Sequence, residues 1–128
     1  MLYTTPLTKN YEFRRLYNKG KSSANKFAVV YCMKNFSSNN RLGITVSTKL
    51  GGAVQRNRIR RRLKEIYRLN EKTVQKGYSI VIVARQRSKE AAWDELQSSV
   101  LYLFGKLNLI NADDSADNQS FGKEKKLL

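Results

Sequence analysis

The sequence predicts an α+β fold, a single-domain α/β sandwich whose elements follow in the order α-β-β-β-α-β-α. Its 128 residues are enough for one hydrophobic core but not for two. Short apolar runs of strand length occur in the first half of the chain and near residue 80, and longer stretches with helical periodicity occur between and after them. The domain is expected to span residues 1–110, followed by a polar tail of mixed charge at 111–128.

The first helix is expected between Asn10 and Gly20. Asn10 is an N-cap candidate, and Gly20 suits the position just after a helix C-terminus. Between them, Phe13, Leu16 and Tyr17 have the i, i+3, i+4 spacing of one helix face. We therefore expect a short helix with one apolar face toward the rest of the domain.

The strands are expected at 26–34, 41–47 and 78–84, with a polar turn at 37–40 and with two or three strands before the second helix. The strand 41–47 alternates large apolar residues with Gly, Thr and Ser. The strand 78–84 is apolar on both faces, which is typical of a strand in the interior of a sheet.

Two longer helices are expected on either side of the strand 78–84. In the first, at 53–70, Ile59, Leu63, Ile66 and Tyr67 form an apolar stripe of about 100°. Ser88 is expected to cap the second, whose apolar stripe runs from Trp93 to Leu107. The connection from strand 41–47 through helix 53–70 to strand 78–84 is a β-α-β crossover. Such crossovers are almost always right-handed, although the sequence does not show the hand.

Basic residues concentrate between Phe13 and Lys64. This segment holds 14 Lys and Arg residues and no Asp or Glu, in a chain whose net charge is +15. Like charges on a small domain repel one another and destabilise the folded state unless a counter-charge binds. A polyanionic partner is therefore the simplest explanation, and nucleic acid is favoured over an anionic membrane surface.

The composition also excludes several kinds of chemistry. The chain has no histidine and one cysteine, Cys32, which excludes an intramolecular disulfide and a Cys/His zinc site and removes the commonest general base. Carboxylates outside the tail are few and scattered, which disfavours a stand-alone metal-dependent nuclease. The absence of a signal peptide and of a membrane-length apolar run predicts a cytoplasmic protein. A ribosomal or other structural RNA-binding protein fits the composition equally well.

The predicted helix 53–70 carries the densest charge. Outside its apolar stripe it is almost entirely cationic, and six of the seven basic residues between positions 56 and 68 are arginine. Arginine favours planar, bidentate contacts with phosphates.

The stretch Ala53-Val-Gln-Arg-Asn-Arg-Ile-Arg-Arg61, after the strand 41–47 and the loop Gly51-Gly52, resembles the protein subunit of bacterial ribonuclease P. The flanking Phe13-x-x-x-Tyr17-x-x-Gly20 and Ile80-Val-Ile-Val-Ala-Arg85 agree, so the resemblance covers about residues 10–107. It implies a left-handed β-α-β crossover. It also implies a ribonucleoprotein enzyme that removes the 5′ leader from precursor tRNA, with the RNA subunit and Mg²⁺ as the catalyst and no catalytic residue in the protein.

Carried over residue by residue, the resemblance implies two RNA-binding sites. The catalytic RNA would be bound by polar residues of the basic helix: Arg56, Asn57, Arg58, Arg60, Arg61, Arg62 and Lys64. The single-stranded leader would lie in a cleft between the first helix and the sheet, at Phe13, Tyr17, Tyr31, Ser47, Lys49 and Arg85. Stacking of bases on aromatic rings tolerates any base, which suits leaders of varied sequence. The alternative for Phe13 and Tyr17 is ordinary helix–sheet core. No membrane contact and no obligate protein partner are expected.

Overall fold

The structure, a computed structural model, describes residues 1–110 of the chain. Five strands form one sheet in the order β1-β4-β5-β3-β2. The strands are β1 (Thr4–Pro6), β2 (Lys21–Ala24), β3 (Ala28–Lys34), β4 (Asn40–Thr45) and β5 (Tyr78–Ala84). The helices are α1 (Asn10–Lys19), α2 (Ala53–Asn70) and α3 (Trp93–Lys106), with 3-10 turns η1 (Thr48–Leu50), η2 (Glu71–Thr73) and η3 (Gln86–Lys89). The predicted tail at 111–128 lies outside the described residues.

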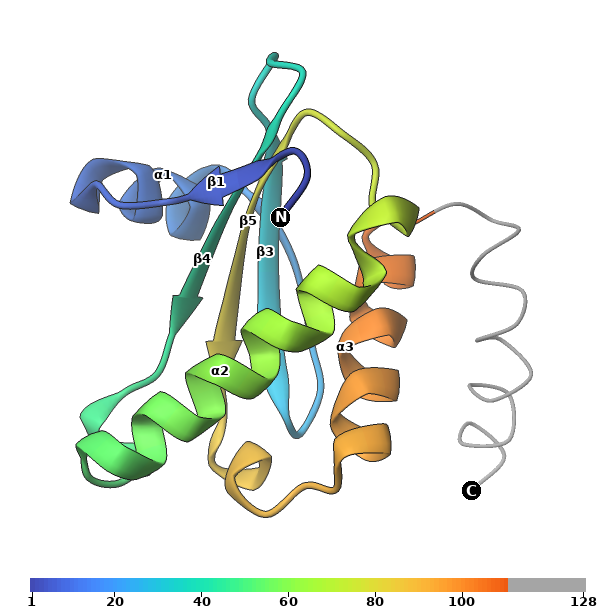
Figure 1. Ribbon diagram of the computed structural model, residues 1–128. Helices are drawn as coiled ribbons and strands as arrows, with labels where there is room; N and C mark the ends of the chain where they lie inside the picture. The colour runs from blue at the N-terminus through green and yellow to red at the C-terminus, as the bar shows by residue number, and fades with distance from the viewer. Residues whose placement is uncertain (111–128) are drawn as a thin grey trace.

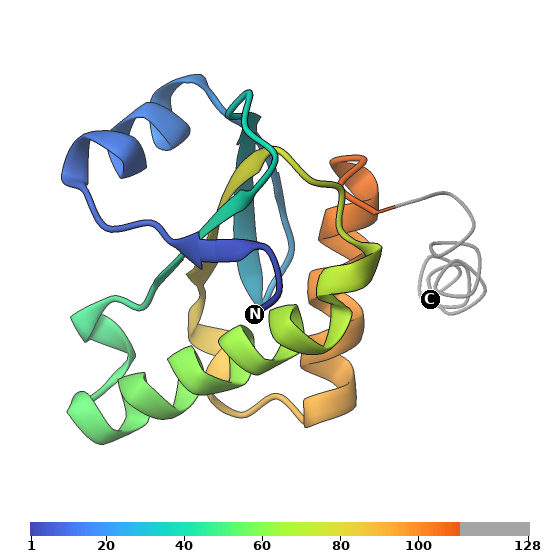
Figure 2. The same cartoon turned by 45° about the horizontal axis from the view of Figure 1, so that its top comes forward.

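The helices form layers on both faces of the sheet. α2 and α3 cover one face, and α1 lies against the other (Figures 1 and 2). The larger core fills the space between the sheet and α2 and α3, while a smaller one, with Leu7, Leu16 and Val81 buried, lies under α1. The apolar stripe predicted on α2 is buried, and so are the central residues of the α3 stripe. Within residues 1–110, no helix is long and apolar enough to span a membrane.

The central strands connect through α2. β4 and β5 are parallel neighbours, and β5 also pairs with β3, so the prediction that this strand is internal is confirmed. In Figure 1 both β4 and β5 point downward, β4 lies to the left of β5, and α2 passes in front of the sheet. The crossover is therefore left-handed, as the family resemblance implies and against the usual rule.

The predicted order of elements is confirmed, with one strand added before the first helix. β1 pairs in parallel with β4 from Thr4 opposite Asn40 to Pro6 opposite Leu42, and becomes an edge of the sheet. A three-residue edge strand shows no hydrophobic periodicity, so pattern analysis does not detect it. The polar β2 forms the opposite edge.

Both ends of α1 differ in detail from the prediction. Lys9 rather than Asn10 occupies the N-cap position, and the Glu12 side chain accepts a hydrogen bond from the Lys9 N–H at 3.3 Å. Gly20 ends the helix in an extended conformation with φ of −75°, so the left-handed cap that favours glycine is not used. A Cβ at Gly20 would lie 2.6 Å from the Leu16 carbonyl oxygen. Glycine is needed there for close backbone approach.

The prediction that Ser88 caps the last helix is wrong. Ser88 lies buried in η3, where its hydroxyl donates to the Arg85 carbonyl at 2.6 Å. α3 begins later, at Trp93, with Ala92 as N-cap and no side-chain cap. The chain leaving β5 first makes a tight turn, and that turn uses the serine.

Candidate RNA-binding sites

The outward side of α2 presents the basic residues of the sequence motif. Its apolar stripe faces the sheet and α3, which leaves Asn57, Arg58, Arg61 and Lys64 exposed and the other motif residues half-buried. We call the following set the basic face of α2: Arg56, Asn57, Arg58, Arg60, Arg61, Arg62 and Lys64.

The charges of the basic face are not neutralised within the part of the chain that the structure describes. Residues 1–110 contain two ion pairs, Arg41 with Glu12 and Arg68 with Glu65, and neither involves the basic face. Arg56 donates through Nε to the Gly51 carbonyl at 3.2 Å, and Arg60 donates through Nη1 to Asn57 Oδ1 at 3.0 Å. These neutral acceptors orient the guanidinium groups but leave their charge available for an anion.

Arg62 differs from the rest of the basic face. It is half-buried, and its Nη2 donates to the carbonyl oxygen of Ala91 at 2.6 Å, just before α3. Burial, and secondarily the charge of Arg58, lowers the pKa of the Arg62 guanidinium from its usual value. The side chain thus connects α2 to the start of α3, and part of its hydrogen-bonding capacity is used inside the protein.

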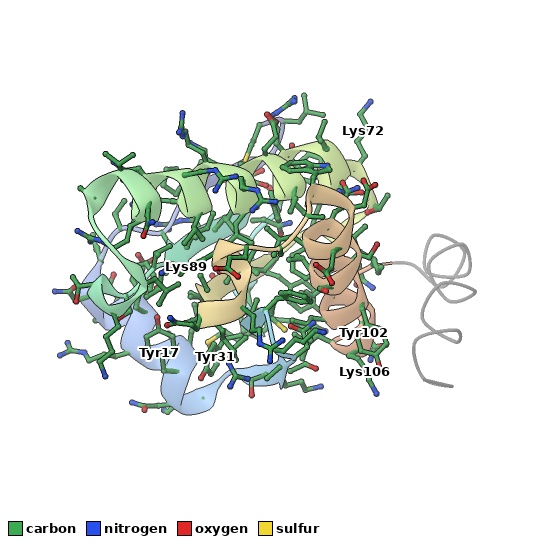
Figure 3. All side chains as sticks on the ribbon, turned by 90° about the horizontal axis from the view of Figure 1, so that it is seen from below. Tyr17, Tyr31, Lys72, Lys89, Tyr102 and Lys106 are labelled. Carbon is green, nitrogen blue, oxygen red and sulfur yellow. The ribbon has the colours of Figure 1, made fainter. Side chains whose placement is uncertain are left out.

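Three aromatic rings line the space between α1 and the sheet. The Tyr17 ring on α1 packs edge-on against Tyr31 on β3, with ring centroids 5.0 Å apart, and Phe13 lies 6.5 Å from Tyr17. The Tyr17 hydroxyl forms a hydrogen bond with Thr45 Oγ1 at 3.0 Å. Figure 3 shows Tyr17 and Tyr31 side by side where α1 meets the sheet. Tyr17 remains 38% exposed, so its ring is accessible from solvent.

Phe13 packs more deeply than Tyr17. It is half-buried against the small core under α1, and its ring lies over Gly43 on β4. A Cβ at Gly43 would be 2.6 Å from the Phe13 ring, so the glycine makes room for it. Phe13 therefore serves as part of the core and as the inner end of the aromatic row.

The polar candidates of the cleft lie just beyond the C-terminal ends of β4 and β5. Ser47 follows β4 and Arg85 follows β5, and these strands are parallel, so both residues leave the sheet at the same end. The Ser47 hydroxyl accepts from the Lys49 N–H at 3.2 Å at the start of η1, and Arg85 Nη1 donates to the Asn25 carbonyl at 2.9 Å. All three predicted residues, Ser47, Lys49 and Arg85, are exposed.

A row of three residues that the sequence analysis does not identify connects the aromatic rings to the ends of β4 and β5. Thr45 on β4 lies opposite Val83 on β5, which lies opposite Val29 on β3, and all three are half-buried. They form the last row of the sheet face beyond Tyr31. The signal was present in the alternation of the strand 41–47, because Thr45 has the parity of Gly43 and Ser47. We use the name α1 cleft for the predicted leader site with Thr45 and Val83 added, that is Phe13, Tyr17, Tyr31, Ser47, Lys49, Arg85, Thr45 and Val83.

The described residues do not form a metal site of their own. Among residues 1–110 there is no group of three or more His, Cys, Asp or Glu side chains that could hold a metal ion. This part of the chain therefore supplies no all-protein cage for Mg²⁺.

Comparison with known proteins gives the family. The sequence matches the family model described as Ribonuclease P over residues 1–108. The chain belongs to the ribonuclease P protein family. The ribonuclease P protein component of Alkaliphilus oremlandii is 46% identical over 106 residues, which are 83% of this chain and 93% of the relative.

Solved ribonuclease P proteins share the fold. The Staphylococcus aureus RNase P protein superposes with a TM-score of 0.76 at 36% identity, over 83% of this chain and 97% of that one. The RNase P protein from Thermotoga maritima superposes with a TM-score of 0.73 at 31% identity, over 84% of this chain and 98% of that one. As a ribonuclease P protein, the chain is a component of a bacterial ribonuclease that acts in tRNA 5′ processing, and its partner in that ribonucleoprotein is RNA.

Proposed function

We propose that the basic face of α2 binds the catalytic RNA of ribonuclease P and that the α1 cleft binds the single-stranded 5′ leader of precursor tRNA. In this proposal the protein assists Mg²⁺-dependent cleavage that removes the leader and forms the mature 5′ end. The observation that carries it is the location of α2 and of the aromatic rings beside α1 on opposite faces of one sheet. One small domain can then contact two RNA segments at once.

The charge and geometry of α2 support its part of the proposal. The arginines of the basic face have no ion-pair partner within residues 1–110, and they project from a helix that is fixed to the sheet by four buried residues. Each phosphate neutralised by such a side chain releases a condensed counterion. Binding of the catalytic RNA should therefore weaken steeply with salt.

The composition of the α1 cleft supports leader binding. Tyr17 and Tyr31 meet edge to face and leave part of the Tyr17 ring exposed, as a base-stacking surface requires. Lys49 and Arg85, which follow β4 and β5, supply positive charge for the sugar–phosphate backbone. Stacking is worth about 1–3 kcal/mol per base and does not depend on base identity.

Catalysis belongs to the RNA subunit in this proposal. The described residues offer neither a histidine nor a cluster of carboxylates for acid–base or metal chemistry, and in this proposal the protein supplies no catalytic residue. Mg²⁺ would be held by the RNA subunit, and the protein would act in the cytoplasm, where tRNA is processed in bacteria.

The test compares precursor-tRNA cleavage by a bacterial ribonuclease P RNA at low Mg²⁺ with and without the protein. We expect strong stimulation by the protein and no cleavage by RNA-free protein. Cleavage by rigorously RNA-free protein would contradict the assignment of catalysis to the RNA.

Two variants separate the two sites. Arg58→Ala should weaken binding to the RNA subunit. It should also reduce the slope of log K against log salt concentration by a little under one unit, the value for one lost phosphate contact. Tyr31→Ala should weaken the binding of precursor tRNA relative to mature tRNA, because only the precursor has a leader. The matched controls are Arg87→Ala, an exposed arginine of η3, and Tyr11→Ala, a tyrosine of α1 that is 57% exposed. Equal losses for both tRNAs with Tyr31→Ala would refute the leader site.

A further inference from the structure

Glu71 is a buried carboxylate that neither RNA-binding site uses. It lies in η2, directly after α2, and is only 2% exposed. Its Oε1 accepts from the Leu2 N–H at 2.8 Å, and its Oε2 accepts from the Tyr3 N–H at 3.1 Å and from the Thr4 hydroxyl. The Tyr3 hydroxyl donates in turn to the Glu71 carbonyl. One acidic side chain thus holds three consecutive residues at the start of the chain.

Buried polar groups extend this attachment to the sheet. The Thr4 hydroxyl forms a hydrogen bond with the Tyr67 hydroxyl at 2.9 Å, and Asn40 Nδ2 donates to the same Tyr67 oxygen at 3.1 Å. The Asn40 N–H donates to the Tyr3 carbonyl at 2.9 Å. These contacts fix β1 beside β4 from the α2 side of the sheet.

Arg41 connects β1 to α1 on the other side of the sheet. Its Nε and Nη2 donate to the Pro6 carbonyl at 3.2 and 3.0 Å, and its Nη1 pairs with Glu12 Oε1 at 3.2 Å. Between Pro6 and Glu12 the chain passes Leu7, whose buried side chain packs with Leu16 in the small core. The end of β1 and the first turn of α1 are therefore held by one guanidinium group.

We infer that Glu71 and Arg41 are positioning residues for the leader, which act by fixing residues 2–7 and through them α1. This inference rests on the proposed leader-binding role of the α1 cleft. Two of the three aromatic rings, Phe13 and Tyr17, belong to α1, whereas Tyr31 belongs to the sheet. The width of the stacking site is therefore the distance from α1 to β3. That distance depends on how residues 2–7 are attached, because the core under α1 has few buried side chains.

The test measures the affinity of the reconstituted holoenzyme for precursor and for mature tRNA. Arg41→Lys keeps the charge but cannot reach both Pro6 and Glu12 with a planar fork, and Glu71→Gln replaces one of the two acceptor oxygens with a donor. Each should lower the preference for precursor over mature tRNA by roughly threefold to tenfold, less than direct loss of a stacking ring. The affinity for the RNA subunit should stay unchanged, because α2 keeps its own anchors.

Matched controls distinguish this from a general loss of structure. Arg68→Lys alters the other ion-paired arginine, and Glu95→Gln alters an exposed carboxylate of α3; both should keep the full precursor preference. Amide hydrogen exchange should accelerate in α1 in Arg41→Lys while α3 stays protected. In a Tyr31→Ala background, Arg41→Lys should cause no further loss of precursor preference, since both act on one stacking site.

The outcomes separate the inference from the function on which it rests. If Tyr31→Ala lowers the precursor preference but Arg41→Lys and Glu71→Gln do not, the inference is wrong and the leader site stands. If the two variants weaken precursor, mature tRNA and RNA-subunit binding equally, their role is general stability and the inference is wrong. If Tyr31→Ala leaves the precursor preference intact, the leader site and the inference fail together.

Discussion

At Gly43 the absence of a side chain lets Phe13 pack onto the sheet. Glycine in a strand interior weakens the strand, so its use there needs a compensating contact. The contact is the Phe13 ring, which an added Cβ would approach to 2.6 Å, while the Leu7 side chain would lie 3.3 Å away. The sequence predicts Gly43 as part of a strand, but not this role, because Phe13 lies 30 positions earlier in the chain and on a helix.

Gly43→Ala should destabilise the protein by about 1–3 kcal/mol, the usual effect of overpacking, because the Phe13 ring must move. Thermal or urea unfolding measures the change. Gly52→Ala is the control, since nothing lies within 4 Å of a Cβ there and its φ of −74° suits alanine. Its effect should stay within about 1 kcal/mol. Equal stability of Gly43→Ala and wild type would mean that Phe13 does not depend on this glycine.

Sequence periodicity predicts α2 in full, but it does not predict the separate role of one of its arginines, Arg62. Its bounds and buried stripe follow directly from periodicity, and the basic face is what remains. Periodicity cannot show that Arg62 reaches the Ala91 carbonyl, because that contact depends on where the chain runs before α3. Neighbouring arginines of one motif can therefore have different roles.

Alanine substitution should lower the folding stability at Arg62 and the affinity for the RNA subunit at Arg61. Arg62→Ala should lower stability by about 1–3 kcal/mol, because it removes a charged hydrogen bond and leaves the Ala91 carbonyl without this donor. Arg61→Ala should leave stability within about 0.5 kcal/mol and weaken binding to the RNA subunit, because Arg61 is exposed. Denaturant unfolding and filter binding on both variants check this, and a stability loss in Arg61→Ala larger than in Arg62→Ala would contradict it.

The Glu71 carboxyl, which holds the N-terminal segment, should make the free energy of unfolding depend on pH in the acid range. Burial raises the pKa of the Glu71 carboxyl, but the Thr4 hydroxyl, the Leu2 and Tyr3 N–H groups and the N-terminal ammonium outweigh it, so the pKa is lower than in the unfolded chain. A lowered folded-state pKa contributes stability above the unfolded value, and the contribution is lost as pH falls through the folded value. The stability difference between wild type and Glu71→Gln should therefore be constant near neutrality and shrink below about pH 4.5. A difference that grows on acidification would contradict this.

Local sequence signals accounted for elements with strong periodicity and failed where tertiary contacts decide. β3, β5, α2 and α3 each bury a regular pattern, and all were predicted. The start of β1 is held by a hydrogen bond from Thr4 to Glu71, 67 positions away, and no local pattern could reveal it. The residues of the α1 cleft come from separate elements that only the fold brings together, so family resemblance predicts most of them and local patterns do not.

For the whole molecule, charge is the dominant feature. Of the 14 basic residues between Phe13 and Lys64, only Arg41 has an ion-pair partner within residues 1–110. Domain stability is only about 5–15 kcal/mol, and repulsion among these charges subtracts from it. The protein should be marginal in low-salt buffer and should gain stability from any anion that binds the folded form.

Millimolar pyrophosphate should raise the melting temperature above that in chloride at matched ionic strength. A ligand at a hundredfold excess over its Kd adds about 2.7 kcal/mol, which corresponds to a rise in melting temperature of roughly 8–14 °C for a domain of this size. Matched ionic strength is needed because salt screens the repulsion in both buffers. Melting curves that coincide would mean that the basic residues form no specific anion site.

Because Cys32 is buried, it does not compete with a cysteine introduced for chemical labelling of either the basic face of α2 or the α1 cleft. It is the only thiol of the chain, lies on the α2 side of β3 and is 2% exposed, and burial raises its pKa despite the nearby Lys21 charge. A buried protonated thiol reacts poorly with maleimides and other electrophiles. A cysteine placed at the exposed position Arg61 or Lys49 would then be the reactive one, without removal of the native thiol. Fluorophores or photo-crosslinkers could thus be attached to one face at a time, and each would report on the RNA that approaches that face.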